Sequence, residues 1–202
     1  MRWSPNIARR TLAVVSSSSQ EQERQLTAES LYRLPDDGWR YELIEGWLVS
    51  EPLPKPRHGR VVSRVCARLE TFASAHGLGA VYAGDAGFVL RRGPDTVRGP
   101  DVAFVSRARV AAIEDPDRYI EGAPDLAVEV RSFGDRTGEV HAKVADYLAA
   151  GCPLVWVVDP AKLTVTVYHE LLAPDVIAAD GELSGEDVLP GFSAPVSELF
   201  EP

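Results

Sequence analysis

The sequence is poor in cysteine, in long apolar runs and in positive charge. Its 202 residues include two cysteines, too few for a disulfide framework. No window approaches the ~18 consecutive apolar residues needed to span a bilayer. Lysine and arginine number 21 against 30 acidic residues, and the net charge of −9 argues against a protein that coats nucleic acid through its phosphates. We therefore expect a soluble, cytoplasmic protein that has no membrane contact and touches nucleic acid only locally.

The overall composition is typical of a folded chain. Hydrophobic residues make up 45% of it and charged residues 25%, which favours one globular domain over disorder. The first residues include Arg9, Arg10 and a serine run, but their apolar stretch is shorter than the ~7 residues of a signal sequence. We expect residues 1–25 to form a disordered tail and residues 26–202 to form a single domain.

Hydrophobic periodicity outlines the elements of this domain. A turn dipeptide, Glu45-Gly46, lies between alternating apolar residues and predicts an N-terminal β-hairpin. After three prolines, apolar residues recur at helical spacing, and this pattern ends at Gly77. The pattern predicts a short helix or turn over residues 26–34 and helices over residues 57–76 and 135–150. It predicts strands over residues 80–90, 102–105, 126–130, 154–158 and 163–168, with a loop over residues 91–100. This order indicates an α/β fold in which helices pack on a sheet.

Two carboxylates lie next to or within predicted apolar strands. Asp101 directly precedes one predicted strand, and Glu129 lies inside another. A carboxylate in an apolar run is costly unless it is paired or bound to a cation. Neighbouring strands bring opposed side chains to ~5 Å, close enough to share a metal ion, whereas Asp125 would lie ~13 Å from Glu129 along the same strand. The alternative interpretation is that Asp101 caps a turn and Glu129 pairs with Arg131.

Lys143 is a third candidate. On a helical wheel it lies at the border between the apolar face of the helix over residues 135–150 and solvent, from which its long stem could reach the edge of the sheet. A solvated surface lysine is the alternative.

Several blocks, taken together and in order, resemble the Uma2 family, whose members are classed as restriction-endonuclease-like proteins of the PD-(D/E)XK superfamily. The resemblance extends from about Leu26 to Phe200. The blocks are residues 40–46, 100–102 and 122–130, Lys143 with Tyr147, residues 150–151 and residues 156–160.

The resemblance implies a restriction-endonuclease-like core, with a mixed sheet flanked by helices (an α+β mixed sheet), and a metal-dependent endonuclease that cuts DNA. Asp101, Glu129 and the backbone carbonyl of Val130 would hold Mg²⁺ or Mn²⁺, which would polarise a phosphodiester. Lys143 would orient water or stabilise charge in the transition state. Glu42 would be an additional ligand or would orient water, unless it is simply an outward hairpin residue.

One departure from the superfamily pattern concerns the lysine that usually follows the glutamate by two residues. Here that position is Arg131, which points to the same face as Glu129 and could stabilise phosphate charge, although its high pKa rules it out as a base. The resemblance transfers the lysine role to Lys143 on the following helix, with Arg131 as its rival. His58, just before the long helix, is a candidate helper near phosphate or an ordinary exposed histidine.

Basic residues offer local contacts for nucleic acid. Arg57, Arg60, Arg64 and Arg68 are spaced by three or four residues and share one helix face, which we call the arginine ridge. Three further arginines lie in the loop that leads to Asp101: Arg91, Arg92 and Arg98. An ordinary solvated helix face is the alternative for the ridge.

The sequence leaves other functions open. A nuclease-fold module that binds nucleic acid or protein without turnover is the alternative to an active endonuclease, and a homodimer is an alternative to a monomer. A small-molecule phosphoesterase is less well supported, because the sequence has no Gly-rich phosphate loop, Ser-His-Asp arrangement or zinc-ligand spacing.

Overall fold

The computed structural model describes residues 25–35, 37–51, 53–84, 86–132 and 134–201. The predicted N-terminal tail, apart from Gln25, lies outside these residues. Within them the elements are α1 (Ala28–Tyr32), β1 (Arg40–Ile44), β2 (Trp47–Glu51), α2 (Pro56–His76), β3 (Gly79–Ala83), β4 (Phe88–Arg91), β5 (Thr96–Arg98), β6 (Val102–Ser106), α3 (Arg107–Val110), β7 (Ile120–Glu121), β8 (Leu126–Val130), α4 (Thr137–Ala149), β9 (Leu154–Asp159), β10 (Thr164–Tyr168), β11 (Asp175–Ala178), β12 (Glu182–Ser184), β13 (Ser193–Pro195) and the 3₁₀ helix η1 (Val196–Leu199).

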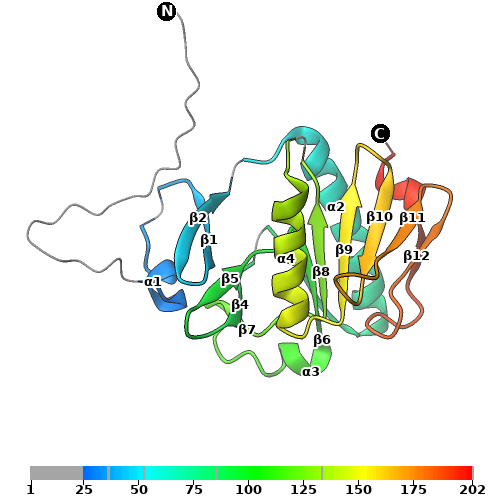
Figure 1. Ribbon diagram of the computed structural model, residues 1–202. Coiled ribbons are helices and arrows are strands. Elements are labelled where there is room, and N and C mark those ends of the chain that lie inside the picture. The colour runs from blue at the N-terminus through cyan, green and yellow to red at the C-terminus, as the bar shows by residue number, and fades with distance from the viewer. Residues whose placement is uncertain (1–24, 36, 52, 85, 133, 202) are drawn as a thin grey trace, which may run out of the picture.

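A six-stranded mixed sheet forms the centre of the molecule, in the order β11-β10-β9-β8-β6-β3. Strands β8 and β9 run parallel, while the other pairs are antiparallel. Helix α4 covers one face and α2 lies behind the other (Figure 1). Because both faces are covered, β8 and β9 are buried along their whole length, which is why their sequences are nearly continuous apolar runs. The predicted mixed sheet flanked by helices is confirmed.

Helix α2 shows how the sequence fixes its own boundaries. Pro56 occupies its first turn, where a missing N–H costs nothing, and Gly77 ends it with a φ of 62°. Between them Val61, Val65 and Leu69 recur at helical spacing and are buried against the sheet. The arginine ridge lies on a different side of the helix, where Arg64 and Arg68 contact the C-terminal segment.

A second sheet of five strands lies beside the first, in the order β2-β1-β5-β4-β7. The predicted hairpin forms its edge, and the turn between β1 and β2 has positive φ at both Glu45 and Gly46. Helix α1 packs on this sheet through Ala28 and Leu31. One face of this sheet packs on α1, and the other face, through Phe88 of β4, shares an apolar cluster with the six-stranded sheet and α4.

Two of the predictions for the middle of the chain were wrong in part. Residues 80–90 form two strands instead of one, and β3 and β4 belong to different sheets. The predicted loop over residues 91–100 contains β5, which pairs with β1 and with β4. The chain therefore passes from one sheet to the other at both places, and the segment from Arg98 to Asp101 lies where the two sheets meet.

The C-terminal part adds β11, β12, β13 and η1, which the periodicity did not predict. Apolar residues of this part, Leu183, Phe192, Val196 and Leu199, join the cluster that packs against α2. None of the described helices is long and apolar enough to cross a membrane.

Candidate functional site

Asp101 and Glu129 lie side by side at one end of the six-stranded sheet. Strands β6 and β8 pair Val102 with Val128, so the next position of the antiparallel register sets Asp101 opposite Glu129. The Asp101 carboxylate accepts a hydrogen bond from the Val130 N–H at 2.7 Å. Asp125 lies at the other end of β8, where it accepts from the Ser106 N–H at 2.7 Å. The structure therefore brings together the two carboxylates that the sequence selected.

Glu129 is buried on the face covered by α4. Its Oε1 accepts a hydrogen bond of 2.7 Å from the Tyr147 hydroxyl, and its Oε2 accepts from Lys143 Nζ at 3.4 Å. Burial raises the pKa of Glu129 to about 8; Lys143 and the Tyr147 hydroxyl oppose the rise, whereas Asp101 and Glu42 add to it. Without further positive charge, this carboxyl holds its proton more tightly than an exposed glutamate does.

Lys143 reaches the sheet from α4, as its border position predicted. Its Nζ lies 3.4 Å from Glu129, 3.5 Å from Glu51 and 3.7 Å from Glu42. Burial lowers the pKa of Lys143, but these three carboxylates together raise it above its ordinary value. The ammonium group is therefore a fixed positive charge among acids and not a surface lysine.

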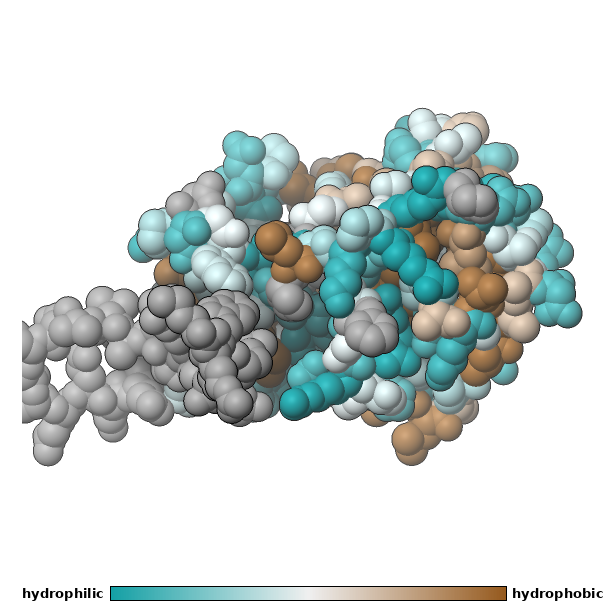
Figure 2. Space-filling model, turned by 90° about the horizontal axis from the view of Figure 1, so that it is seen from above, coloured by the Kyte–Doolittle hydropathy of each residue, from teal (hydrophilic) through white to brown (hydrophobic). Residues whose placement is uncertain are grey.

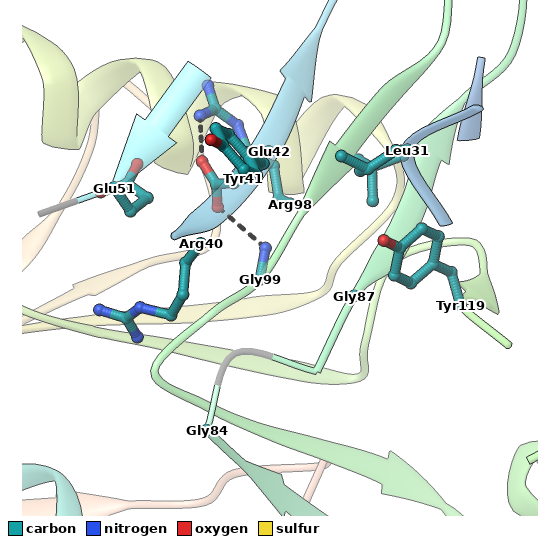
Figure 3. Close-up of a pocket in the computed structure, with 11 residues that line it drawn as sticks. Leu31, Arg40, Tyr41, Glu42, Glu51, Gly84, Gly87, Arg98, Gly99 and Tyr119 are labelled. Carbon is teal, nitrogen blue, oxygen red and sulfur yellow. Dashed lines mark hydrogen bonds and ion pairs between the residues drawn. The ribbon is translucent and has the colours of Figure 1, made fainter. Parts of the chain in front are cut away.

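Glu42 is buried on β1 and contacts residues of β5 and α4. Its carboxylate accepts from Arg98 at 2.8 Å and from the Gly99 N–H at 2.9 Å (Figure 3). Burial would raise the pKa of Glu42, but Lys143, Arg98 and the Gly99 N–H together lower it. Arg98 also pairs with Asp146 of α4 at 2.6 Å. We call this set the polar junction: Glu42, Glu51, Arg98, Glu129, Lys143, Asp146 and Tyr147.

Two other predicted residues lie close to this end of β8. Arg131 points to the same side as Glu129, but its guanidinium pairs with Asp159 of β9 at 3.2 Å and donates to the Asp135 carbonyl. His58, near the start of α2, lies 3.2 Å from Asp101 and is mostly buried. His58 is therefore not the ordinary exposed histidine, whereas Arg131 is engaged beside the site rather than directed at it.

The arginine ridge is not an open basic surface. Arg57 donates to the Pro160 carbonyl, and Arg60 donates to the Glu201 carbonyl at 3.3 Å. Arg64 lies 3.8 Å from the Glu201 carboxylate, and Arg68 pairs with Glu198. Two acids far along the chain therefore partly neutralise the charge that the helix sequence displays.

The arginines of the segment before Asp101 are also paired. Arg91 contacts Glu45 at 2.9 Å, and Arg92 contacts Glu29 and Asp95, each at 2.9 Å. Arg98, expected as a nucleic-acid contact, is instead 3% exposed because it lies between the two sheets. Its guanidinium pairs with Glu42 and with Asp146.

Sequence reasoning missed two acids of the polar junction and the polar role of Tyr147. Asp146 and Tyr147 follow Lys143 by three and four residues, so a shared helix face was a usable signal for both. Glu51 offered none, because its contact with Lys143 depends on how the hairpin packs against α4. No group of three or more histidine, cysteine, aspartate or glutamate side chains in the described part of the chain is arranged to hold a metal ion.

A cavity of about 220 Å³ opens beside the polar junction, and Glu42, Glu51 and Arg98 are among its lining residues (Figure 3). Figure 2 views the molecule from above, the end at which β8 finishes and α2 and α4 begin, and shows hydrophilic residues across the middle of that face.

Two comparisons with known proteins found a match. The family model for Uma2, described as putative restriction endonuclease, matches residues 28–197. The solved structure of a putative nuclease belonging to DUF820 from Anabaena variabilis is similar to this chain with a TM-score of 0.74 and 19% sequence identity, over 87% of this chain and 97% of that one. At this identity the likeness shows a shared fold. No curated protein matches the sequence.

Proposed function

Because the chain belongs to the Uma2 family, described as putative restriction endonucleases, we propose that it is a metal-dependent endonuclease that hydrolyses DNA phosphodiester bonds. One observation carries the proposal. Asp101 and Glu129 lie next to each other on neighbouring strands, and Lys143 lies 3.4 Å from Glu129. Two carboxylates and a cation at one strand end are the groups that phosphodiester hydrolysis requires.

The donor set suits Mg²⁺ or Mn²⁺. Asp101, Glu129 and the backbone carbonyl of Val130 would hold the ion, and such hard oxygen donors are the ligands that these ions prefer. Asp101 and Glu42 both repel the Glu129 carboxylate and raise its pKa. A divalent cation would offset this excess of negative charge. When bound, the ion would polarise the phosphodiester and lower the pKa of a water molecule.

Lys143 would act as a cation and not as a base. Its three carboxylate neighbours raise its pKa, so the ammonium group keeps its proton. A fixed positive charge beside the scissile phosphate stabilises the charge that develops in the transition state. Glu42 would keep Lys143 in place, since it contacts both Lys143 and the buried Arg98. Arg131 would serve at most as a charge beside the site, because Asp159 already holds its guanidinium.

Cleavage of supercoiled and linear DNA in Mg²⁺ or Mn²⁺ tests the proposal. Asp101→Asn and Glu129→Gln should each lower the cleavage rate by about 10²–10³-fold or more, as for other charge-stabilising groups. Asp125→Asn is the matched control, because Asp125 lies at the opposite end of β8 and should leave the rate nearly unchanged. Full cleavage by the Glu129→Gln variant would refute the mechanism.

A binding module without turnover is the second candidate, and a specific observation favours it. Both oxygens of Glu129 are engaged within the protein, by Tyr147 and by Lys143, and the usual lysine position holds Arg131. Calorimetric titration with Mn²⁺ separates the two functions. Binding that disappears in Asp101→Asn supports the nuclease, whereas no Mn²⁺ binding by the parent protein supports the module.

A further inference from the structure

The cavity beside the polar junction has two chemically different ends. Figure 3 shows Arg40 and Glu51 on one side, and Leu31 and Tyr119 on the other. Val97 adds to the apolar wall, and the aromatic ring of Tyr119 is half-buried against α1 through an edge contact with Tyr32. An apolar and aromatic wall facing polar groups suits a flat, partly polar ligand.

The cavity is connected to the proposed catalytic groups through two shared residues. Glu42 and Glu51 line it, and both carboxylates also contact Lys143, at 3.7 Å and 3.5 Å. A ligand in the cavity is therefore one side chain away from Lys143. Its volume of about 220 Å³ lies below the ~300–1,000 Å³ of typical small-molecule sites, which limits the occupant to a group about as large as one planar ring system.

We propose that this cavity binds one unpaired nucleobase of the DNA strand being cut, so that the substrate is single-stranded or locally unpaired DNA. The inference rests on the proposed function, since it assigns the neighbouring phosphate to the Lys143 site. An unpaired base can leave the stack and enter a pocket, where an aromatic side chain replaces its stacking partner. A base held in a duplex cannot enter without the cost of unstacking and unpairing.

The charge of the protein agrees with this assignment. The net charge is −9, and Glu198 and Glu201 partly neutralise the arginine ridge. Attraction to phosphates is therefore weak, and contacts to a base must supply much of the binding free energy.

The test compares three fluorescently labelled ligands in EDTA, where no cleavage occurs: a short single strand, its duplex, and an abasic strand of the same length. The wild-type protein should bind the single strand most tightly. Tyr119→Ala should weaken that affinity roughly 5- to 100-fold, the loss expected for one base–aromatic stacking contact. Tyr119→Phe keeps the ring and should bind like the wild type, and thermal unfolding should show that both variants remain folded.

A second variant tests the same site if Tyr119→Ala fails to fold. In Gly87→Ala the new Cβ would lie 2.4 Å from the Tyr119 ring, so the ring must move while the catalytic residues stay intact. This variant should weaken binding of the single strand and leave Mn²⁺ binding unchanged.

Equal affinity for the normal and abasic strands, or no effect of Tyr119→Ala, would overturn the nucleobase site but leave the nuclease proposal standing. A single strand that binds through Tyr119 but is never cut in Mg²⁺ or Mn²⁺ would instead contradict the nuclease proposal alone.

Discussion

The polar junction and the arginine ridge both contain ion pairs, the ridge through its partners Glu198 and Glu201, but water reaches the two to different degrees. In the junction the side chains of Arg98 and Glu42 are 3% and 6% exposed. On the ridge those of Arg68 and Glu198 are 36% and 33% exposed. Exposed ion pairs are screened by water and salt and contribute little to stability, whereas a buried charge without its partner is strongly destabilising. Because of this difference in burial, the polar junction should contribute more to the stability of the fold than the ridge does.

The position of each cluster explains this difference. The junction lies where the two sheets meet, and β1, β2, β5, β8 and α4 all contribute polar side chains to it. The ridge lies on a partly exposed side of α2, and its acidic partners, Glu198 and Glu201, come from the C-terminal segment. A functional site is better sought in the junction, because there the fold keeps charges close together in spite of the cost of burial.

Removal of one cation should show the contrast most strongly. Lys143→Met leaves Glu42, Glu51 and Glu129 facing one another without the shared ammonium group, and should lower the free energy of unfolding by about 3 kcal/mol or more. Arg68→Met, the matched change on the ridge, should lower it by less than about 1 kcal/mol. Urea unfolding at neutral pH measures both. If both variants lost the same free energy of unfolding, burial would not explain how much each cluster stabilises the protein.

The sequence predicted the parts of the fold that depend on local periodicity. The apolar stripe of α2 and the buried runs of β8 and β9 are readable because each follows from the element's own spacing. Strand β5 is not readable in this way. It has three residues, Thr96 to Arg98, and exists because β1 and β4 supply its hydrogen-bonding partners.

The same distinction holds for the candidate site. The closeness of Asp101 and Glu129 follows from two adjacent strands, whose pairing the apolar runs suggest. The contact between Glu51 and Lys143 depends on the packing of the hairpin against α4, which no local pattern encodes. Glu198 lies 130 residues after Arg68 in the chain (198 − 68), so the helix sequence alone could not reveal that the ridge is paired.

A buried acid outside both clusters sharpens the comparison. The Asp95 side chain is 8% exposed, yet its carboxylate accepts from the N–H groups of Ala28 at 2.8 Å and Gly93 at 3.1 Å. Burial raises the pKa of Asp95, but these donors and Arg92 together lower it below its ordinary value. In Glu129 the balance has the opposite sign, because neighbouring carboxylates add to the effect of burial.

The lowered pKa makes Asp95 a source of acid sensitivity. An acid with a depressed pKa stabilises the folded state above its unfolded pKa of ~3.9, and this contribution disappears as the pH falls through the folded pKa. We expect Asp95→Asn to lose about 1–2 kcal/mol at neutral pH and to show a shallower decline of stability below pH ~4. Urea unfolding as a function of pH measures this. The exposed Asp187→Asn is the control and should follow the wild-type curve; an Asp95→Asn curve parallel to the wild type would contradict the assignment.

The smallest effect is expected on the ridge. Three unpaired arginines would each contribute up to about 0.9 to the slope of log affinity for duplex DNA against log salt concentration. Because Glu198 and Glu201 already pair with Arg68 and Arg64, replacing Arg60, Arg64 and Arg68 together with glutamine should change that slope by less than about one. The complementary variant, Glu198→Gln with Glu201→Gln, removes the acidic partners and should make the slope steeper. If the triple arginine variant instead flattens the slope by the full amount, DNA displaces these acids on binding, and the exposed ridge contributes more to recognition than its pairing in the unbound protein suggests.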